Sequence, residues 1–218
     1  MTAVPMTAAP TTGAPAIDWG RLAMVPLGVL GAAAAGAALL RHTGPAHLAA
    51  GVLTLAFYAL LVGAYLRRRP ARSTSTSWSV WVAAPLATLL PLTLPFAGTG
   101  APGTLPLVGG EVLLVAGMAW SVWSVRALDS SLSVVPQARE LVRRGPYAWV
   151  RHPLYLGELV ATLGLALTLG GPLPLAGWAA LVALLAYRAR HEERLLGAVL
   201  PGYEEYRRST ALLVPGVL

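Results

Sequence analysis

The chain has 218 residues, of which 56% are hydrophobic and 11% are charged, and its mean hydropathy is +0.64. Soluble domains carry about 25% charged residues, so this composition excludes an ordinary soluble domain and indicates an integral membrane protein. The net charge of +7 comes from arginines between long apolar runs, which predicts contact with anionic lipid headgroups rather than with nucleic acid. The absence of cysteine excludes disulfides, thiolate metal ligands and a cysteine nucleophile.

The first 18 residues, MTAVPMTAAPTTGAPAID, are rich in alanine, proline and threonine and contain no basic residue. A secretory signal requires a positively charged segment before its apolar core, so this stretch is predicted to be a disordered tail.

Six segments then meet or approach the length of about 20 apolar residues that a transmembrane helix needs. They are roughly residues 21–40, 46–66, 78–97, 106–126, 153–170 and 173–190. The last two are somewhat short and are joined by GGPLP, a pattern typical of a helical hairpin near a binding site. The predicted fold is therefore all-α: a polytopic membrane protein with about six transmembrane helices and a C-terminal helical tail.

The arginines indicate the orientation of these helices. Four of them lie in residues 67–72, five in 126–151 and five from 188 onward, and a six-helix topology puts all three segments on one side. The opposite loops, 41–45, 98–105 and 170–174, contain only Arg41. By the positive-inside rule both termini and the 126–151 segment are predicted to be cytoplasmic, in a membrane of the bacterial cytoplasmic type.

The polar residues divide the chain into three parts. We expect a tail over 1–18, four transmembrane helices over 19–126, and a cofactor-binding and catalytic region over 127–218. In this last region helix six is predicted to leave the membrane, to break at Pro201-Gly202, and to be followed by a short helix with Tyr203 and Tyr206.

The stretch GPYAWVRHPLYLGE, residues 145–158, carries polar groups at the start of helix five. Pro153 suits the first turn of a helix and restricts His152 to an extended conformation. The N–H groups of that first turn, together with Arg151, favour the binding of an anion. The alternative is that Arg151 and His152 reach lipid headgroups while Tyr155 belongs to an interfacial aromatic belt. Glu158, inside the membrane, is either functional or a structural partner of Arg188.

A second polar group lies at the end of helix six. Arg188 and Glu192 are four residues apart and can form a helix salt bridge. Glu193 can accept hydrogen bonds from a ligand amine or act as a base, and Arg188 can hold an anionic substrate group. The four histidines are too dispersed for a metal site, and neither a Walker motif nor a Rossmann fingerprint occurs.

These residues resemble the isoprenylcysteine carboxyl methyltransferase and phospholipid methyltransferase superfamily of membrane enzymes. The similarity covers about residues 128–215 and follows the pattern G-x-Y-x-x-x-R-H-P-x-Y-x-G, then E-E-x-x-L, then a tail with two tyrosines. The matching positions are Gly145, Tyr147, Arg151, His152, Pro153, Tyr155, Gly157, Glu192, Glu193, Leu196, Tyr203 and Tyr206. Residues 1–125 are similar only in being helical and apolar.

The resemblance implies a methyltransferase that uses S-adenosylmethionine and takes a lipophilic acceptor from the bilayer, with no metal. It assigns cofactor binding to Tyr147, His152, Pro153, Tyr155, Gly157, Glu192, Glu193 and Tyr203, and catalysis to Arg188, Glu193 and Arg151. In this assignment Glu193 is the acidic partner of Arg188. Many relatives carry an arginine where this chain has Ser209, and whether Arg207 or Arg208 replaces it stays open at this point.

Two other functions stay open at this point. One is a membrane reductase similar to the steroid reductases, which would use NADPH and would need more basic residues for its 2′-phosphate. The other is a non-catalytic membrane protein that has kept the pocket.

Overall fold

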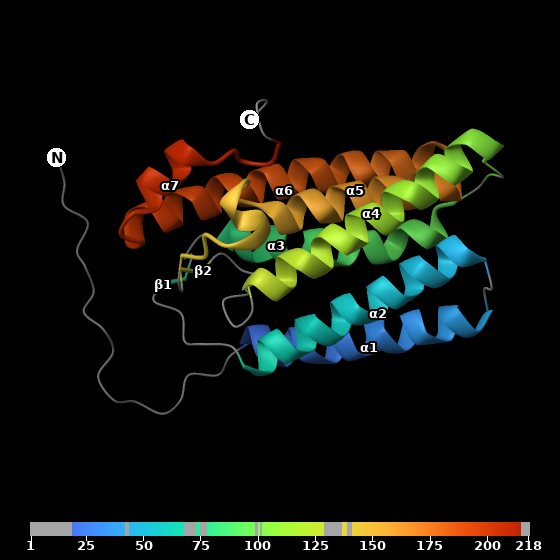
Figure 1. The fold of residues 1–218 in the computed structure, drawn as a ribbon, viewed down its shortest axis with the longest axis horizontal. Coiled ribbons are helices and arrows are strands. Elements are labelled where there is room, and N and C mark those ends of the chain that lie inside the picture. The colour runs from blue at the N-terminus through green and yellow to red at the C-terminus, as the bar shows by residue number, and fades with distance from the viewer. Residues whose placement is uncertain are drawn as a thin grey trace.

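The computed structural model describes residues 19–41, 44–67, 73–74, 78–98, 100, 102–128, 137–138 and 141–214. The predicted disordered tail over 1–18, most of the 67–72 loop and parts of the 127–150 connection lie outside these residues. The described chain is a bundle of helices that run along the long dimension of the molecule (Figure 1). The prediction of an all-α fold is thus confirmed.

The helices agree closely with the six predicted segments. They are α1 (Trp19–Arg41), α2 (Pro45–Leu66), α3 (Trp78–Thr93) with the 3-10 turn η1 (Leu94–Phe96), α4 (Thr104–Leu128), α5 (Pro153–Leu169) and α6 (Pro172–Val199). A 3-10 turn, η3 (Gly145–Ala148), precedes α5, and a short helix, α7 (Tyr203–Ser209), follows α6. The two-residue strands β1 (Ser73–Thr74) and β2 (Gln137–Ala138) pair antiparallel.

Four of these helices, α1, α2, α4 and α6, are long and apolar enough to cross a membrane. The apolar stretches 82–96 and 153–169 are shorter, so the predicted total of six spans stays a prediction. Helix α6 is not short, because its 28 residues continue past the apolar segment into the charged sequence. It ends at Val199, and Gly202 adopts a left-handed conformation with φ 77° before α7, which confirms the predicted break.

Small residues let α4 and α5 pack at very short distance. A Cβ atom placed on Gly110 would lie 2.7 Å from the carbonyl oxygen of Gly164, and one on Gly117 would lie 2.7 Å from that of Gly157. Gly110 and Gly117, like Gly157 and Gly164, are seven residues apart, which is two helical turns, so each pair lies on one face. Backbone contact through small residues is the usual means of helix association in membranes.

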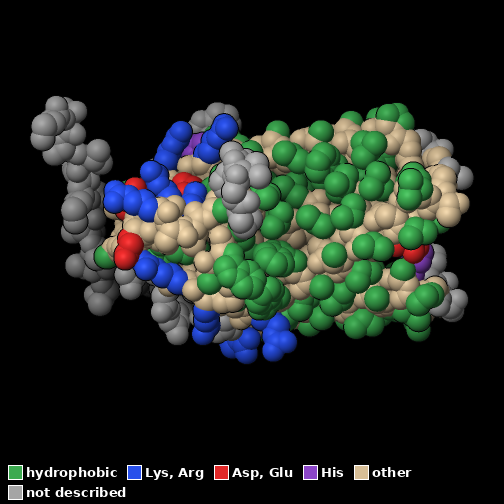
Figure 2. Space-filling model, turned by 45° about the horizontal axis from the view of Figure 1, so that its top comes forward, with side chains coloured by type: hydrophobic (Ala, Val, Ile, Leu, Met, Phe, Trp, Pro, Cys, Tyr) green, Lys and Arg blue, Asp and Glu red, His purple; other side chains and the backbone are tan. Residues whose placement is uncertain are grey.

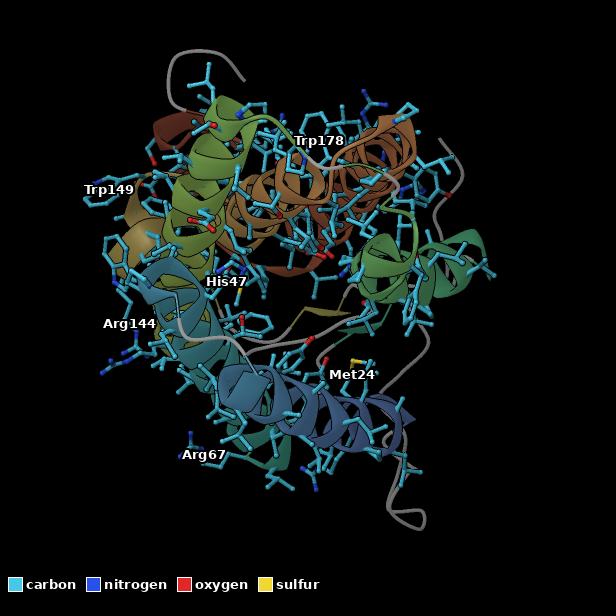
Figure 3. The ribbon with its side chains drawn as sticks, turned by 90° about the vertical axis from the view of Figure 1, so that its right-hand side faces the viewer. Met24, His47, Arg67, Arg144, Trp149 and Trp178 are labelled. Carbon is cyan, nitrogen blue, oxygen red and sulfur yellow. The ribbon has the colours of Figure 1, made fainter. Side chains whose placement is uncertain are left out.

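The other helices surround this pair. Helix α2 packs against α4, and α1 packs against α2. A cluster of Met24, Ala64 and Tyr65 also contacts Leu128 and Leu154. Figure 3 shows Met24 pointing from α1 into the molecule. Helix α3 packs against α6, with Ala87 beside Leu181 and Leu185.

The charged side chains are distributed unequally between the two ends of the bundle. The connections α1–α2, α3–α4 and α5–α6 lie at one end, whereas α7, η3 and the small sheet lie at the other (Figure 1). Figure 2 shows the arginine side chains gathered at the end where α7 lies, and hydrophobic side chains covering the rest of the visible face. The predicted separation of arginine-rich and arginine-poor ends agrees with this arrangement, and the chain fits a multi-pass membrane protein.

Candidate functional site

The start of α5 holds the first half of the site. The helix begins at Pro153, as predicted, with His152 as its N-cap at φ −121°. No side chain caps this helix, because the imidazole of His152 turns toward α6 instead. The indole N–H of Trp120 on α4 donates to the carbonyl oxygen of Pro153 at 2.8 Å, which ties the first turn of α5 to α4.

The C-terminal segment fixes the residues before this helix. Val150 and Ala211 form an isolated parallel bridge, and the N–H of Arg151 donates to the carbonyl oxygen of Ala211 at 2.8 Å. The N–H of His152 donates to the carbonyl oxygen of Leu212 at 3.1 Å. The backbone that carries Arg151 and His152 is thus held by residues about 60 positions later in the chain.

Glu193, on the last turns of α6, is the centre of a dense hydrogen-bond network. Its Oε1 atom lies 3.0 Å from Nε of Arg151, 3.0 Å from Nε2 of His152 and 2.6 Å from the hydroxyl of Tyr203, which donates to it. The Glu193 side chain is only 12% exposed. One carboxylate therefore joins α5, α6 and α7.

Glu192 makes a second set of contacts beside the first. It accepts a hydrogen bond from the hydroxyl of Tyr155, and it lies 3.6 Å from Nη2 of Arg188 and 3.6 Å from Nδ1 of His152. His152 therefore stands between the two carboxylates, with one ring nitrogen toward each.

The pairing of Arg188 differs from the one that the resemblance implied. The contact between Arg188 and Glu192 confirms the expected helix salt bridge, whereas Glu193 pairs with Arg151 and His152 rather than with Arg188. The physical reason is helical spacing, because residues four apart share one face of α6 and residues five apart do not.

Aromatic rings form the wall next to the carboxylates. The rings of His152 and Tyr155 stack with centroids 5.2 Å apart and planes 11° apart. The guanidinium of Arg188 lies 5.0 Å from the centroid of the Tyr155 ring, and both side chains are buried. Arg188 also interacts electrostatically with Glu158, so Arg188 connects this wall to the buried part of α5.

Three further tyrosines close the network toward the tail. Tyr206 donates to the backbone carbonyl of Tyr147 at 2.7 Å. Burial raises the pKa of Tyr206 to about 12. Burial also raises the pKa of Tyr147, and burial with the hydrogen bond to Glu193 raises that of Tyr203. All three hydroxyls therefore stay protonated near neutral pH, and those of Tyr203 and Tyr206 act as donors.

The structure brings together most of the predicted site residues. Those in the network around the two carboxylates are Arg151, His152, Tyr155, Arg188, Glu192, Glu193 and Tyr203. Pro153 and Tyr147 support it through the backbone. Gly157 lies elsewhere, against α4, where a Cβ atom would come 3.0 Å from the carbonyl oxygen of Gly117. Its position gives it a packing role. The predicted cofactor-binding and catalytic roles stay predictions.

Three arginines at or near the tail have other partners in the structure. The side chains of Arg207 and Arg208 lie 3.4 and 3.6 Å from Glu204 on the exposed face of α7, so neither guanidinium replaces the missing arginine in the network. Arg151, expected to be catalytic, uses its guanidinium to bind Glu193 and the backbone carbonyls of Arg207 and Thr210. These contacts suit a residue that positions the tail.

The sequence reasoning missed several supporting groups. The backbone of Ala211 and Leu212 and the indole of Trp120 carry no signal of their own, because their roles depend on tertiary contact. At the opposite end of the molecule, His47 lies 3.5 Å from Glu111.

The arrangement can bind a ligand that carries charges of both signs. Two carboxylates lie beside two guanidinium groups and one imidazole, so a cationic group and an anionic group can each find a partner within one small region. Among the described residues no group of three or more His, Cys, Asp and Glu side chains could hold a metal ion.

Comparison with known proteins agrees with the motifs. Residues 105–200 match the family described as phospholipid methyltransferase. A nickel-cobalt-cadmium resistance protein of Alcaligenes xylosoxydans is 30% identical over 142 residues, which cover 63% of this chain and 62% of that protein. A cobalt-zinc-cadmium resistance protein of Cupriavidus metallidurans is 32% identical over 142 residues, with the same two shares. The similarity thus spans less than two thirds of each relative's length.

Proposed function

We propose that this protein is an integral membrane methyltransferase that uses S-adenosylmethionine, because residues 105–200 match the phospholipid methyltransferase family. Its acceptor is a lipophilic molecule: a lipid headgroup, an isoprenylcysteine-like carboxylate or a small hydrophobic compound. The region from residue 127 to residue 218 supplies the cofactor site, and residues 19–126 supply membrane helices.

The observation that carries this proposal is the paired carboxylate network. Glu192 and Glu193 are 16% and 12% exposed, and side chains from α5, α6 and α7 converge on them. Burial of a charged side chain costs free energy unless the charge is paired. Networks of buried charges therefore occur mainly where a protein binds a charged ligand or must hold a fixed geometry.

The residues fit S-adenosylmethionine by their chemistry. Its amino group and ribose hydroxyls suit the carboxylates of Glu192 and Glu193, and its carboxylate suits a guanidinium or the uncapped N–H groups at the start of α5. The stacked rings of His152 and Tyr155 give a flat face beside them. When bound, the cofactor supplies a methyl group on a positively charged sulfur.

The side chains of the network then hold the cofactor-binding carboxylates in position. Arg151 and Tyr203 hold Glu193, and Tyr155 and Arg188 hold Glu192, so the ligand-facing groups are fixed before the cofactor arrives. Alignment of two reacting groups supplies a large part of the rate enhancement in such transfers. Arg188 is buried one helical turn before Glu192, which supports the proposal that it holds the acceptor on the side of the membrane helices.

The proposed location is the cytoplasmic membrane, with the site at its cytoplasmic face. The arginine distribution favours this orientation, since 14 of the 16 arginines fall in the three segments assigned to that side. An acceptor dissolved in the bilayer would reach the site sideways between the helices.

Binding of purified protein to candidate cofactors tests the proposal. Calorimetric titration in detergent with S-adenosylmethionine, with its demethylated product and with NADPH distinguishes a methyltransferase from a reductase and from a protein without a cofactor. We expect binding of the first two ligands only. Binding of NADPH alone, or the absence of binding by all three ligands, would contradict the assignment.

Variants then test the site. We expect Glu192→Gln and His152→Ala to weaken binding of S-adenosylmethionine at least tenfold, because each removes a partner from the network. Glu204→Gln is the matched control, since this exposed carboxylate lies on α7 outside the network. Normal binding by both site variants would remove these residues from the cofactor site even if the function holds.

The acceptor is found by labelling. Native membranes incubated with protein and methyl-labelled S-adenosylmethionine should yield a labelled apolar product, identified by mass spectrometry. Because the two relatives are named for metal resistance, the same incubation with and without Co²⁺, Zn²⁺ and Cd²⁺ shows whether these ions change the transfer.

A further inference from the structure

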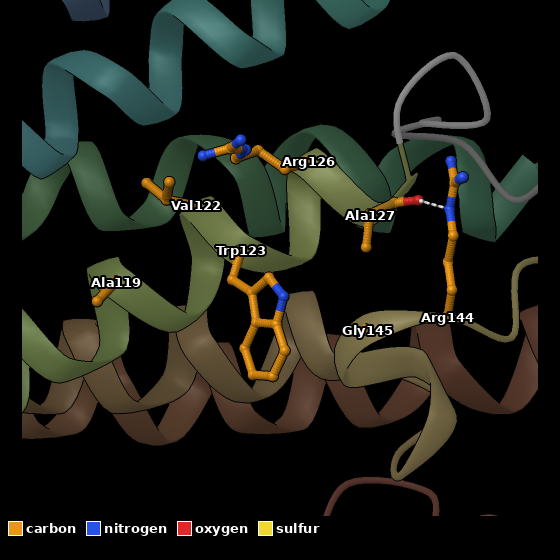
Figure 4. A pocket seen from close by; sticks show the side chains of 7 residues that line it. All are labelled: Ala119, Val122, Trp123, Arg126, Ala127, Arg144 and Gly145. Carbon is orange, nitrogen blue, oxygen red and sulfur yellow. Dashed lines mark hydrogen bonds between the residues drawn. The ribbon is translucent and has the colours of Figure 1, made fainter.

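A pocket separate from the carboxylate network lies at the end of α4. Seven residues line it, with a volume of about 530 Å³: Ala119, Val122, Trp123, Arg126, Ala127, Arg144 and Gly145. Ligand pockets commonly have volumes of about 300–1,000 Å³, so a headgroup with part of an acyl chain fits this one. Figure 4 shows the side chains of Arg126 and Arg144 on either side of Ala127, one from α4 and one from the segment before η3.

The lining is apolar along α4 and positive at its end. Ala119, Val122 and Trp123 belong to a candidate membrane span that continues to Leu128. Arg126 lies in the last turn of this helix. From Ala119 to Ala127 the helix rises about 12 Å, at 1.5 Å per residue. That length matches a polar headgroup at one end and the first methylene groups of a chain at the other.

The local backbone builds this pocket. Gly145 has φ 60°, a conformation that favours glycine, and a Cβ atom there would lie 3.2 Å from Cβ of Ala127 and 3.4 Å from Nε1 of Trp123. Arg144 donates from Nε to the carbonyl oxygen of Ala127 at 3.3 Å, which fixes its side chain along the end of α4. The chain therefore comes close to α4 at this point and places a second arginine beside the first.

Within the described part of the chain, the positive charge at this pocket has no acidic partner. Among the described residues, no carboxylate lies within salt-bridge distance of Arg126 or Arg144. By contrast, Arg143, Arg151, Arg207 and Arg208 each pair with a glutamate. The exposed indole of Trp123 next to two such arginines is typical of the membrane interface, where aromatic rings lie at headgroup level.

We propose that this pocket is a binding site for an anionic phospholipid. Arg126 and Arg144 bind the phosphate, and Ala119, Val122 and Trp123 contact the upper part of an acyl chain. Basic pockets beside transmembrane helices are a general means of binding anionic headgroups. This site is independent of the methyl-transfer proposal, because none of its residues belongs to the carboxylate network.

Binding at this pocket has a structural consequence. Gly145 is two residues before Tyr147, whose carbonyl oxygen accepts the hydrogen bond from Tyr206. A lipid that holds Arg144 against α4 therefore stabilises the segment that leads into Arg151 and His152. We expect anionic lipid to raise the melting temperature of the full chain.

Lipid titration of the full chain in maltoside micelles tests the proposal. Phosphatidylglycerol is compared with phosphatidylcholine of the same acyl chains, and with inorganic phosphate, by thermal unfolding and native mass spectrometry. We expect phosphatidylglycerol alone to raise the melting temperature and to stay bound. Equal effects of the two lipids would overturn the preference for an anion, and an equal effect of phosphate would overturn the role of the acyl chain.

Variants locate the binding. Each arginine near an anionic lipid contributes about 1 kcal/mol, or roughly fivefold in affinity. We therefore expect Arg126→Gln to weaken phosphatidylglycerol binding roughly fivefold and the double variant with Arg144→Gln roughly 20-fold or more. Arg190→Gln, an exposed arginine of α6 outside the pocket, is the charge-matched control. Unchanged binding by Arg126→Gln, whose folding is checked by circular dichroism, or an equal loss in Arg190→Gln, would refute the site.

Discussion

Glu193→Gln gives the strongest test of the carboxylate network. The substitution keeps the shape of the side chain and removes its negative charge. In the structure a single oxygen, Oε1, accepts contacts from Arg151, His152 and Tyr203 at 3.0, 3.0 and 2.6 Å. No other described side chain connects α5, α6 and α7 in this way.

The magnitude follows from these contacts. Hydrogen bonds to charged groups contribute about 1.5–3 kcal/mol each, and loss of one partner of a buried ion pair costs about 3–5 kcal/mol. The amide of glutamine retains one acceptor oxygen and the three contacts share one atom. We therefore expect the free energy of unfolding to fall by about 2–4 kcal/mol. For a chain of this length, a change of that size lowers the melting temperature by roughly 4–16 °C.

Thermal unfolding in detergent, followed by circular dichroism, measures this change. Glu204→Gln is the control, because this carboxylate also pairs with arginines but lies exposed on α7. A melting temperature of Glu193→Gln within about 1 °C of the wild type would refute the argument that the network fixes the tail against α5 and α6.

Three further substitutions test the packing and the tyrosines. Gly110→Ala should destabilise the fold by about 1–3 kcal/mol, because its Cβ would lie 2.7 Å from the Gly164 carbonyl oxygen. Gly109→Ala is the control, since the space around Gly109 is open and its substitution should leave the stability unchanged. Equal melting temperatures of the two variants would contradict this reasoning. Tyr206 has a pKa raised to about 12, so its contribution to stability is complete below pH 10 and is lost as pH rises toward 12. Wild-type stability should therefore fall by about 2–3 kcal/mol more than that of Tyr206→Phe over this range, and parallel pH profiles would count against it. Tyr155→Phe removes the donor to Glu192 and should weaken cofactor binding by roughly tenfold in a calorimetric titration, while unchanged affinity would place the cofactor elsewhere.

The sequence alone predicted the helical architecture, because bilayer length and apolar composition are properties of continuous segments. Each predicted segment corresponds to a helix within a few residues, except that α6 continues past residue 190 to Val199. Pro153 and Gly202 mark a helix start and a break where local sterics require them. Arginine counting sorted the loops for the same reason, since charge is a property of each loop by itself.

The site was predicted in part from sequence. The spacing of Arg188 and Glu192 implied their contact, because helical periodicity relates positions on one element. The motifs identified Glu193 and His152 as site residues, but their contact joins positions 41 residues apart, and periodicity carries no information about such a distance.

Only the tertiary structure decided which groups meet across elements. In the structure Arg151 binds Glu193 and the carbonyl oxygens of the tail, and Gly157 packs against α4. Arg144 lies beside Arg126, where the two line the pocket proposed to bind lipid. Each of these outcomes depends on how closely two helices approach and on where the backbone of a distant segment passes. Local propensity and charge leave both undetermined, because packing selects one arrangement among many that the same helices could adopt.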